Sequence, residues 1–360
     1  MEYKILVINP GSTSTKIAIY KNEEPVLEKS ISHSSEEISK FDRIIDQKDF
    51  RKDMIVESIE AEGHSIDQLD AIVARGGLLY PLSGGTYLVN GQMIEDLTEG
   101  VQGEHASNLA GLIANELASK VDIPAYVVDP VAVDEFKEEA RISGIPEIVR
   151  RSLGHALNVK ATARQAAKDL DVDFNDCNFV VAHLGGGISI APILKGRIID
   201  YNNANESGPF SPERCGQLPV GDLVKLAFSG EYEYRELKKK MVGKGGLTGY
   251  LGTNDCQEVE ERIEAGDEKA KEVYQAMIYQ IAKEIGRMAA VLKGEVEAII
   301  LTGGPAHSKT ITDGVTEYVE HIAPVEVYPG AMEMLALCQG ALRVLKDEEK
   351  PLEYIGERRK

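Results

Sequence analysis

The chain opens with two apolar segments separated by a short polar tip. Four apolar residues, Ile5 to Ile8, are typical of a strand buried on both faces, and Asn9-Pro10-Gly11 is a turn signal that ends it. Apolar β-branched residues resume at Ile17 and Ile19. The pattern therefore predicts a strand, a tight tip and a returning strand over Lys4 to Tyr20.

The tip of this hairpin is rich in groups that can bind an anion. Gly11 allows backbone N–H groups to approach a ligand closely, and Ser12 and Thr13 add hydroxyl donors on short side chains. A Walker-type phosphate loop is excluded, because no Gly-Lys-Ser/Thr sequence opens a helix here. Taken alone, the motif is consistent with a phosphate-binding hairpin and equally with a solvated turn between two core strands.

A second segment of the chain repeats the pattern of this first hairpin. Phe179 to Ala191 is again an apolar strand, a glycine-containing tip and a returning strand, with His183 and Gly185 at the spacing of Asn9 and Gly11. A hairpin at the start of each half indicates two similar domains. We therefore expect an α/β fold of two duplicated domains that flank an active-site cleft, with both tips directed at one ligand.

The remaining apolar pattern sets the expected domain limits. We place the first domain at residues 1–148 and the second at 149–334, and we expect a C-terminal helix, at about 335–360, to pack back onto the first. Apolar residues at helical spacing predict one long helix over Lys269 to Leu292. Lys238 to Gly252 contains five glycines and three consecutive lysines, which predicts a mobile, solvated loop.

Several charged residues come directly after predicted strands or at the start of a helix. Arg75 follows a strand and precedes two glycines, so it is placed to meet a ligand at the carboxyl edge of a sheet, although a surface salt bridge is an alternative. Asp129 follows another strand and could hold Mg2+, orient an arginine or form an Asx turn. Glu333 opens the last helix, where a capping role competes with a metal-linked one.

Two further cations lie in irregular segments. His155 follows Arg150-Arg151 and a glycine and precedes an alanine-rich helix, so it is either a capping or core histidine or a functional one. Arg214 lies in a proline-rich loop, Asn202 to Gly221, which would present a cation rigidly.

Composition limits the classes of function. The chain has 360 residues, 43% of them hydrophobic, which is typical of a globular protein with a large core. Its formal net charge of −19 argues against nucleic acid or an anionic membrane as partner. Four widely separated cysteines indicate reduced thiols rather than a zinc site. No leader or membrane-spanning stretch is evident, so we expect a cytoplasmic protein.

Five short motifs follow one another along nearly the whole chain: Asn-Pro-Gly-Ser-Thr-Ser-Thr-Lys from Asn9, Ala-Arg-Gly-Gly from Ala74, Arg-Arg-x-x-x-His from Arg150, His-Leu-Gly-Gly-Gly from His183 and Leu-Thr-Gly-Gly from Leu301. Together they resemble the motifs of the acetokinase family, and within it most closely those of butyrate kinases and branched-chain carboxylate kinases. The resemblance implies the actin-like (ribonuclease H-like) ATPase fold, ATP/ADP with Mg2+, and reversible phosphoryl transfer to a short-chain fatty acid. It also implies a homo-oligomer, a dimer or higher.

The resemblance also implies roles for individual residues. Asn9 would grip the transferred phosphate, Arg75 would bind the substrate carboxylate or phosphate, and His155 would stabilise the transition state. Asp129 and Glu333 would hold the magnesium site. The residues that would bind phosphate or nucleotide are Gly11, Ser12, Thr13, His183, Gly185, Gly186, Gly187, Thr302, Gly303 and Gly304.

The chain departs from the acetate kinase pattern at three places. Acetate kinases carry a second arginine in a Thr-Arg-Ser-Gly-Asp-Leu segment that reads Gly-Gln-Leu-Pro-Val-Gly-Asp-Leu here, and Arg214, just upstream, could supply the cation. Acetate kinases also have a bulky aromatic residue before the histidine and a branched residue two positions after the first arginine, where this chain has Gly154 and Gly77. These glycines predict a roomier acyl pocket that takes butyrate or isobutyrate, and they predict that Gly154→Phe shifts preference toward shorter acids.

The chemistry of the acceptor agrees with this set of residues. A fatty acid, with a pKa near the ~4.3 of glutamate, is already ionised at neutral pH and needs no general base. Because the carboxylate and the phosphate that it attacks are both anions, the reaction needs their negative charge to be neutralised. Arg75, His155, Arg214 and Mg2+ are suited to this task. The alternatives are an acetate or propionate kinase, a sugar or polyol kinase of the same fold in which Asp129 is a base, and a nucleotide-dependent scaffold or chaperone.

Overall fold

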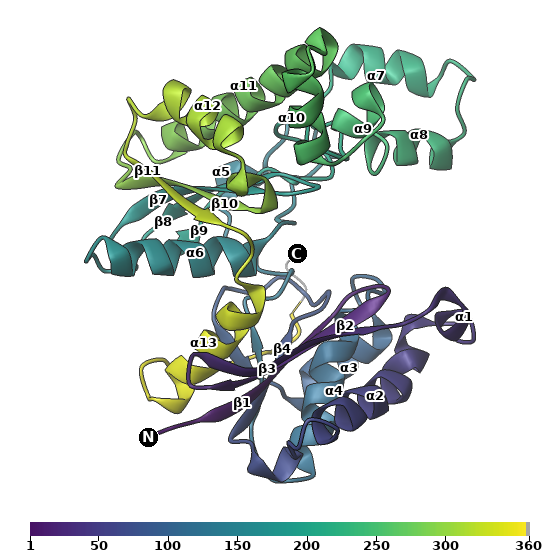
Figure 1. Cartoon of the computed structure of the whole chain (residues 1–360), viewed down its shortest axis with the longest axis vertical. Coiled ribbons are helices and arrows are strands. Elements are labelled where there is room, and N and C mark those ends of the chain that lie inside the picture. The colour runs from purple at the N-terminus through teal and green to yellow at the C-terminus, as the bar shows by residue number, and fades with distance from the viewer. Residues whose placement is uncertain (358–360) are drawn as a thin grey trace. The chain divides into compact units, whose positions relative to one another are not determined.

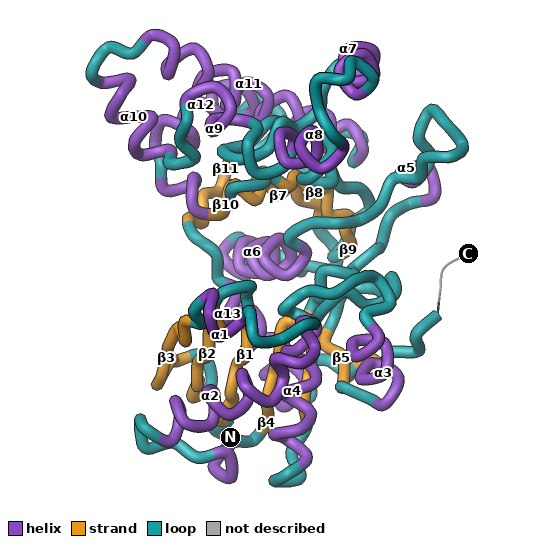
Figure 2. The backbone as a smooth tube through the Cα atoms, turned by 90° about the vertical axis from the view of Figure 1, so that its right-hand side faces the viewer, coloured by secondary structure: helices purple, strands orange, loops and turns teal. Residues whose placement is uncertain are grey.

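A computed structural model describes residues 1–357 and divides the chain into two compact units. Unit 1 contains Met1–Asp134 and the chain from Met332 to the last described residue, and unit 2 contains Glu135–Ala331. Each unit is built on one sheet with helices packed against it (Figures 1 and 2), so the predicted α/β class is confirmed. The last three residues of the expected C-terminal helix, 358–360, lie outside the described part.

Unit 1 contains a seven-stranded sheet in the order β12-β5-β6-β4-β1-β2-β3. Strands β1, β4 and β6 are parallel, whereas β2 and β3 continue the sheet in antiparallel pairing. The predicted first hairpin is confirmed, but β1 runs on through Asn9 and Pro10, two residues beyond its predicted end, because Asn9 pairs with Lys16 and Pro10 with Thr15. The bounds are β1 (Lys4–Pro10), β2 (Ser14–Lys21), β3 (Glu24–Ser32), β4 (Ala71–Arg75), β5 (Thr86–Leu88), β6 (Ala125–Val128) and β12 (Leu352–Glu353).

Helices cover both faces of this sheet. Helices α4 and α13 both pack against β1, β4 and β6, and Figure 1 shows them on opposite sides of the strands. Helix α2 packs against α4, and β5 is paired on its outer side with β12. The helices are α1 (Ser35–Ile38), α2 (Lys48–Glu60), α3 (Gly91–Glu99), α4 (Asn108–Ser119) and α13 (Glu333–Leu345), with short 3-10 turns η1 (Ile44–Gln47) and η2 (Ile66–Gln68).

Unit 2 contains a five-stranded sheet in the order β11-β10-β7-β8-β9. Strands β7, β10 and β11 are parallel. The second hairpin is confirmed, since β7 and β8 are antiparallel and His183 pairs with Ser189 beside the tip. The bounds are β7 (Asn178–Leu184), β8 (Ser189–Leu194), β9 (Arg197–Ile198), β10 (Ala298–Gly303) and β11 (Val325–Pro329).

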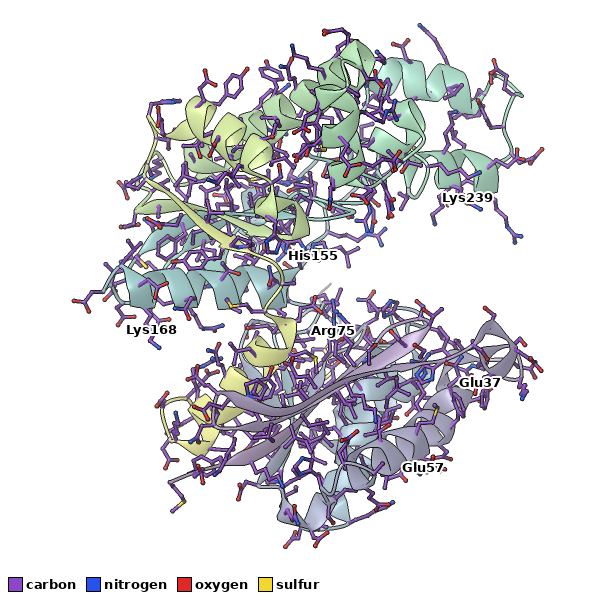
Figure 3. All side chains as sticks on the ribbon, viewed as in Figure 1. Glu37, Glu57, Arg75, His155, Lys168 and Lys239 are labelled. Carbon is purple, nitrogen blue, oxygen red and sulfur yellow. The ribbon has the colours of Figure 1, made fainter. Side chains whose placement is uncertain are left out.

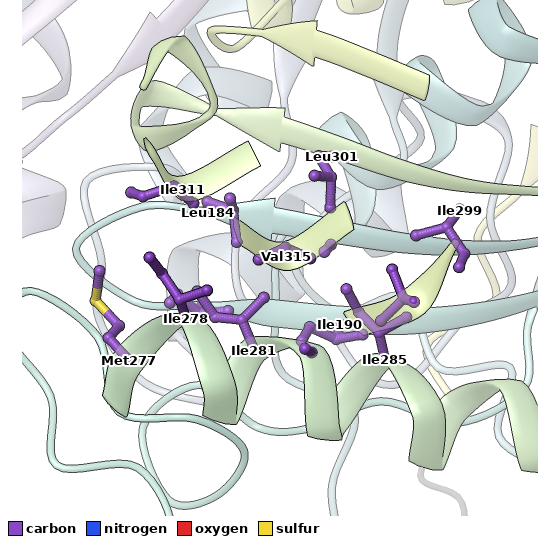
Figure 4. Close-up of a cluster of buried hydrophobic side chains, with 14 of the residues drawn as sticks. Leu184, Ile190, Met277, Ile278, Ile281, Ile285, Ile299, Leu301, Ile311 and Val315 are labelled. Atoms are coloured by element: carbon purple, nitrogen blue, oxygen red, sulfur yellow. The ribbon is translucent and has the colours of Figure 1, made fainter. Parts of the chain in front are cut away.

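The core of unit 2 lies between this sheet and helix α11. The predicted long helix is confirmed as Glu268–Val291, and its buried face, which includes Met277, Ile281 and Ile285, packs against β7 and β8 (Figure 4). The other helices are α5 (Glu138–Arg141), α6 (Ala156–Asp169), α7 (Val220–Ala227), α8 (Tyr234–Met241), α9 (Gly246–Leu251), α10 (Cys256–Glu264) and α12 (Lys309–Val319), with a 3-10 turn, η3 (Gly304–His307).

The prediction of a mobile loop over residues 238–252 is wrong. The three lysines occupy the last turn of α8, where the helix dipole favours cations, and α9 follows almost at once. Gly246 has a φ of +57°, and a Cβ there would overlap the Ser211 carbonyl oxygen. This glycine therefore allows close backbone packing, which a composition count does not distinguish from flexibility.

Within residues 1–357, no helix combines the length and the apolar character that crossing a bilayer requires.

Candidate active site

In unit 1 the structure brings together three of the predicted residues. Asn9 lies near the end of β1 next to β4, whose last residue is Arg75, and Glu333 is the first residue of α13. The Asn9 Nδ2 and the Arg75 Nη1 both donate to Glu333 Oε2, each at 2.9 Å, and Arg75 Nη1 lies 3.5 Å from Asn9 Oδ1. Both charged side chains remain about a quarter exposed, at 27% for Arg75 and 24% for Glu333. The cluster is thus held in place yet accessible to a ligand (Figure 3 labels Arg75).

Asp129 follows β6 in a separate, buried position. Its backbone and its carboxylate both bind Gly85: Gly85 N–H donates to Asp129 Oδ1 at 2.8 Å, and Asp129 N–H donates to the Gly85 carbonyl at 3.0 Å. Asp129 adopts a φ of +38°, an uncommon value for a residue other than glycine. These bonds fix the orientation of the carboxylate at the carboxyl end of its strand, and its role as a magnesium ligand stays a prediction.

Two carboxylates of unit 1, Glu333 and Asp129, carry the oxygen donors that a magnesium ion prefers. Among residues 1–357, no group of three or more His, Cys, Asp or Glu side chains could hold a metal ion. Mg2+ at phosphoryl-transfer sites usually takes one or two carboxylates and completes its shell with phosphates and water. Glu333, which is partly exposed beside Asn9, and Asp129 have the donor chemistry for such a partial set.

The first hairpin tip places its residues as predicted. Gly11 N–H donates to the Ser14 carbonyl at 2.7 Å, which closes the turn, while Ser12 and Thr13 are exposed. Behind the tip lies Arg51, which is almost fully buried and which the sequence analysis did not single out. Its guanidinium binds the carbonyl oxygens of the tip.

In unit 2 the structure brings His155 and His183 into direct contact. His155 immediately precedes α6, and His183 lies near the end of β7 (Figure 3 labels His155). Their rings stack with centroids 4.1 Å apart at an angle of 25°. The His155 Nδ1 is 3.0 Å from the hydroxyl of Ser189, which is buried on β8. His155 makes no side-chain capping bond to its helix, which leaves the capping interpretation without support.

Asn158 holds the second ring of this pair. It lies one turn after His155 on α6, and its Nδ2 donates to His183 Nδ1 at 2.7 Å. Because an amide nitrogen can only donate, Nδ1 accepts, and the neutral His183 ring carries its proton on Nε2. Thr162 and Thr302 extend this buried polar network around the ring. The network therefore sets both the orientation and the tautomer of His183.

Gly154 does not open space beside His155. A Cβ at Gly154 would overlap the ring of Tyr201, which is buried against this position. Arg150 fixes the Tyr201 segment, since its Nη2 donates to Asp200 Oδ1 at 2.7 Å and to the Tyr201 carbonyl at 3.0 Å. Gly154→Phe would collide with this ring, so the expectation that it simply narrows an open pocket is wrong.

Gly77 is likewise a packing position. A Cβ there would overlap Asn108 Oδ1 and would lie 2.8 Å from Leu97 Cδ2. The Asn108 side chain also accepts the Leu78 N–H at 2.9 Å, which fixes the chain after Arg75. The space that a branched residue would fill is therefore taken by helices α3 and α4, and the argument for a roomier pocket does not follow from this glycine.

Arg214 is brought to the second hairpin tip. Its guanidinium lies directly on Gly187, where a Cβ would overlap it. Ser211 fixes this loop, because its hydroxyl accepts the Arg214 N–H at 3.1 Å and donates to the Gly186 carbonyl. Burial lowers the pKa of Arg214, and the neighbouring Glu213 opposes this shift. The loop thus presents a cation at the tip, a contact that the sequence pattern did not predict, and the replacement of the second family arginine by Arg214 stays a prediction.

The third glycine turn lies next to the second tip. Thr302 pairs with His183 in the register of β10 and β7, and its hydroxyl donates to the Gly330 carbonyl at 3.1 Å. Gly303 has a φ of +95°, and a Cβ there would overlap the Leu184 carbonyl oxygen, so only glycine fits. Gly304 then opens η3, and a Cβ added there would meet no atom within 4 Å.

A pocket of about 690 Å3 in unit 2 is lined by several of these residues. Gly185 and Gly186 of the second tip and Gly304 of the third turn form part of its wall, together with residues from the start of α10 and the end of η3. This volume is in the range of small-molecule and cofactor sites. The pocket therefore joins three predicted nucleotide-binding positions in one cavity.

Sequence reasoning missed four residues that support this site: Arg51, Asn158, Ser189 and Tyr201. Asn158 could have been found from its position one turn after His155, and Ser189 from the register opposite His183 in the predicted hairpin. Tyr201 gave no local signal, because it reaches Gly154 from a distant irregular segment.

The two-sheet α/β fold is similar to that of a solved acetate kinase, a propionate kinase and a ROK family protein. The chain is similar to a crystal structure of Porphyromonas gingivalis acetate kinase, with a TM-score of 0.78 at 19% identity over 95% of this chain and all of that one. A propionate kinase from Francisella tularensis gives 0.71 at 19% identity over 94% and 98% of the two chains. A ROK family protein from Streptococcus pneumoniae gives 0.53 at 12% identity over 96% and 99%.

A family model described as the acetokinase family matches residues 139–324, more than half of the chain. The chain therefore belongs to the acetokinase family, and it is a phosphotransferase of the carboxylate kinase class. The predicted family and fold are confirmed.

Proposed function

We propose that the protein transfers the γ-phosphoryl group of ATP reversibly to a short-chain carboxylate, with butyrate or isobutyrate as its preferred acid. The observation that supports this most is the composition of the two residue clusters. They provide cations and hydrogen-bond donors, from Arg75 and Asn9 in unit 1 and from His155 and Arg214 in unit 2. An ionised acid needs charge neutralisation and no proton acceptor, and this set matches that need.

In this proposal, each residue of unit 1 has a distinct task. Arg75 binds the substrate carboxylate or the transferred phosphate through a guanidinium that Glu333 keeps in place at 2.9 Å. Asn9 donates to the transferred phosphoryl group from the end of β1. Glu333 and Asp129 are the candidate protein ligands for Mg2+, which would supply neutralisation of the phosphate charge.

The residues of unit 2 bind nucleotide and stabilise developing charge. His155 donates a hydrogen bond to an equatorial oxygen of the phosphoryl group in flight, and stacked His183 fixes the plane of its ring. Arg214 adds positive charge at the Gly185–Gly187 tip. The pocket formed by the two glycine turns and α10 takes the nucleotide.

The choice of acid rests on the motifs rather than on open space. The motifs are most similar to those of butyrate and branched-chain carboxylate kinases, which supports a four-carbon acid. An acetate or propionate kinase is the second candidate, because Tyr201 and Asn108 fill the positions next to Gly154 and Gly77.

An acid panel tests this proposal. Initial rates of acyl hydroxamate formation with ATP and Mg2+ are measured for acetate, propionate, butyrate, isobutyrate and valerate. We expect the highest kcat/KM for butyrate or isobutyrate. A higher value for acetate would assign the second candidate, and ATP consumption with glycerol or a hexose but no acid would refute a carboxylate acceptor.

A further inference from the structure

Arg51 is a buried cation that the proposed mechanism does not use. It lies on α2 at helical spacing from Ile55 and Ile59, on the face that packs inward, and only 1% of its surface is exposed. No ion pair joins Arg51 to a carboxylate in the described residues. Burying an unpaired charge costs on the order of several kcal/mol. Packing alone therefore does not account for a buried arginine at this position.

The guanidinium uses all five of its N–H donors on neutral acceptors. Nη1 donates to the Gly11 carbonyl at 2.8 Å and to Ser14 O and Thr15 Oγ1 at 3.3 and 3.2 Å. Nη2 donates to the Ser12 carbonyl at 3.0 Å and, with Nε, to Gln47 Oε1 at 2.9 and 3.1 Å. Burial lowers the pKa of Arg51. The guanidinium thus holds the backbone of the tip from its inner side.

These contacts direct the backbone of the tip. The N–H and C=O of a trans peptide point in opposite directions. Because Arg51 draws the carbonyls of Gly11 and Ser12 inward, the N–H groups of Ser12 and Thr13 point outward, at exposed residues. The Thr13 carbonyl is bound in turn by the His33 N–H at 2.8 Å. The outer side of the tip therefore presents N–H donors, and the carbonyl oxygens that would repel an anion are held on the inner side.

We propose that Arg51 is a positioning residue that makes the β1–β2 tip a phosphate site, and that the bound phosphate supplies the counter-charge that the guanidinium lacks. The proposal rests on the proposed function, in which this hairpin holds phosphate. Arg51 acts through the peptide groups of Gly11 to Thr13 and touches no substrate itself. Its positive charge, buried behind the donors, adds to the potential that the anion meets.

The test compares two Arg51 variants with a matched control. Arg51→Gln removes the charge, and Arg51→Lys keeps it but loses the planar fork. Lys52→Gln removes a cation from the next residue of the same helix, where it is paired with Glu116 and Asp49. Binding of inorganic phosphate is followed by amide NMR shifts of Ser12 and Thr13, and ADP affinity is measured by calorimetry.

We expect phosphate binding to weaken about ten-fold or more in Arg51→Gln and less in Arg51→Lys, with ADP affinity and Lys52→Gln unchanged. An equal loss of phosphate and ADP binding would indicate general damage and would overturn the positioning role. Phosphate affinity at the wild-type level in both variants would also overturn it. If Arg51→Gln does not fold, Arg51→Lys decides alone: weakened phosphate binding with unchanged ADP affinity supports the proposal, and unchanged phosphate binding refutes it.

The outcomes separate this proposal from the proposed function. A wild-type protein that binds phosphate at Ser12 and Thr13 but phosphorylates no carboxylate would refute the function and leave the role of Arg51 standing. A protein that phosphorylates butyrate while its Arg51 variants bind phosphate normally would refute the role of Arg51 alone.

Discussion

At the scale of single residues, His155 shows how position confers a chemical role. It stands at the N-terminus of α6, where the helix dipole favours negative charge nearby, and its Nδ1 is engaged by Ser189. In the proposed mechanism, the Ser189 hydroxyl donates to this Nδ1, and the Nε2 of the ring is the donor to a phosphoryl oxygen. Stacking on His183, whose own tautomer is set by Asn158, restricts the plane in which that donor lies.

His155→Ala should reduce kcat by about 10²- to 10³-fold, as is usual when one donor to a developing charge is lost. The ATP affinity should change much less, because His155 does not line the pocket that we propose for the nucleotide. Acyl hydroxamate formation measures the rate. His321→Ala, at an exposed histidine of the same unit, serves as the control. Turnover of His155→Ala close to wild type would remove this residue from the mechanism.

The residues that could be predicted from sequence are those whose neighbours along the chain reveal them. Arg75 ends one apolar strand, Asp129 comes directly after another, and His155 comes directly before a helix. Arg51 has the helical spacing of the buried residues Ile55 and Ile59, but a charged residue in such a pattern is normally assigned to the surface. The carbonyl groups that it binds lie on a hairpin about forty residues earlier, and no local pattern reports that contact.

At the scale of elements, β3 leads into a titratable contact behind the first hairpin. His33 follows β3 and its Nε2 is 2.8 Å from the Thr15 hydroxyl. Burial lowers the pKa of His33 below its ordinary value of 6.5, the positive charge of Arg51 adds to this effect, and Glu37 opposes it. At a pH between this lowered pKa and 6.5, the folded protein therefore holds a neutral His33 ring that the unfolded chain would protonate.

The stability of unit 1 should fall on mild acidification because of this histidine. Above the ordinary pKa of 6.5 the His33 ring is neutral in both the folded and the unfolded protein, and it does not change the free energy of unfolding. As the pH falls from 6.5 toward the lowered pKa, the unfolded state binds the proton first and stability decreases, by at most about 1.4 kcal/mol per pH unit for one site. His33→Gln should lessen the fall in Tm between pH ~7.5 and ~5.5. Equal slopes in the variant and the wild type would contradict this account.

The pocket that we propose for the nucleotide can be probed through α10. Cys256 opens this helix and lines the pocket, and burial raises the pKa of its thiol to about 11. Alkylation by iodoacetamide should be slow at neutral pH, faster at alkaline pH, and slowed again by ADP. Cys215, whose pKa is also raised by burial, lies outside this pocket and is the internal control. If ADP leaves the labelling of Cys256 unchanged, as judged by peptide mass spectrometry, the assignment of the pocket is wrong.

Hairpins were predictable as elements because their apolar runs and glycine tips are local signals. The helices α8 and α9 were not, because glycines and consecutive lysines are equally typical of a mobile loop. In the fold, the lysines sit at a helix C-terminus and Gly246 packs against Ser211. The same residue types therefore serve a structured segment when tertiary contacts supply the reason for them.

At the scale of the whole molecule, the duplicated hairpin and the order of motifs were enough to predict the α/β class and the family. The sheet of unit 1 shows what lies beyond sequence patterns. Its outermost strand, β12, comes from the end of the chain and pairs with β5, which is some 260 residues earlier in the sequence. The pairing of β12 with β5 depends on the assembled fold. The charged segment that contains β12 has no sequence pattern that predicts a strand.

The most direct test of the central claim is 31P NMR of the protein with ATP, Mg2+ and butyrate. The account predicts that an acyl phosphate signal grows together with ADP, that it requires the acid, and that adding ADP to acyl phosphate regenerates ATP. ADP with inorganic phosphate as the sole products, or phosphate transferred to glycerol or a hexose in place of the acid, would contradict it.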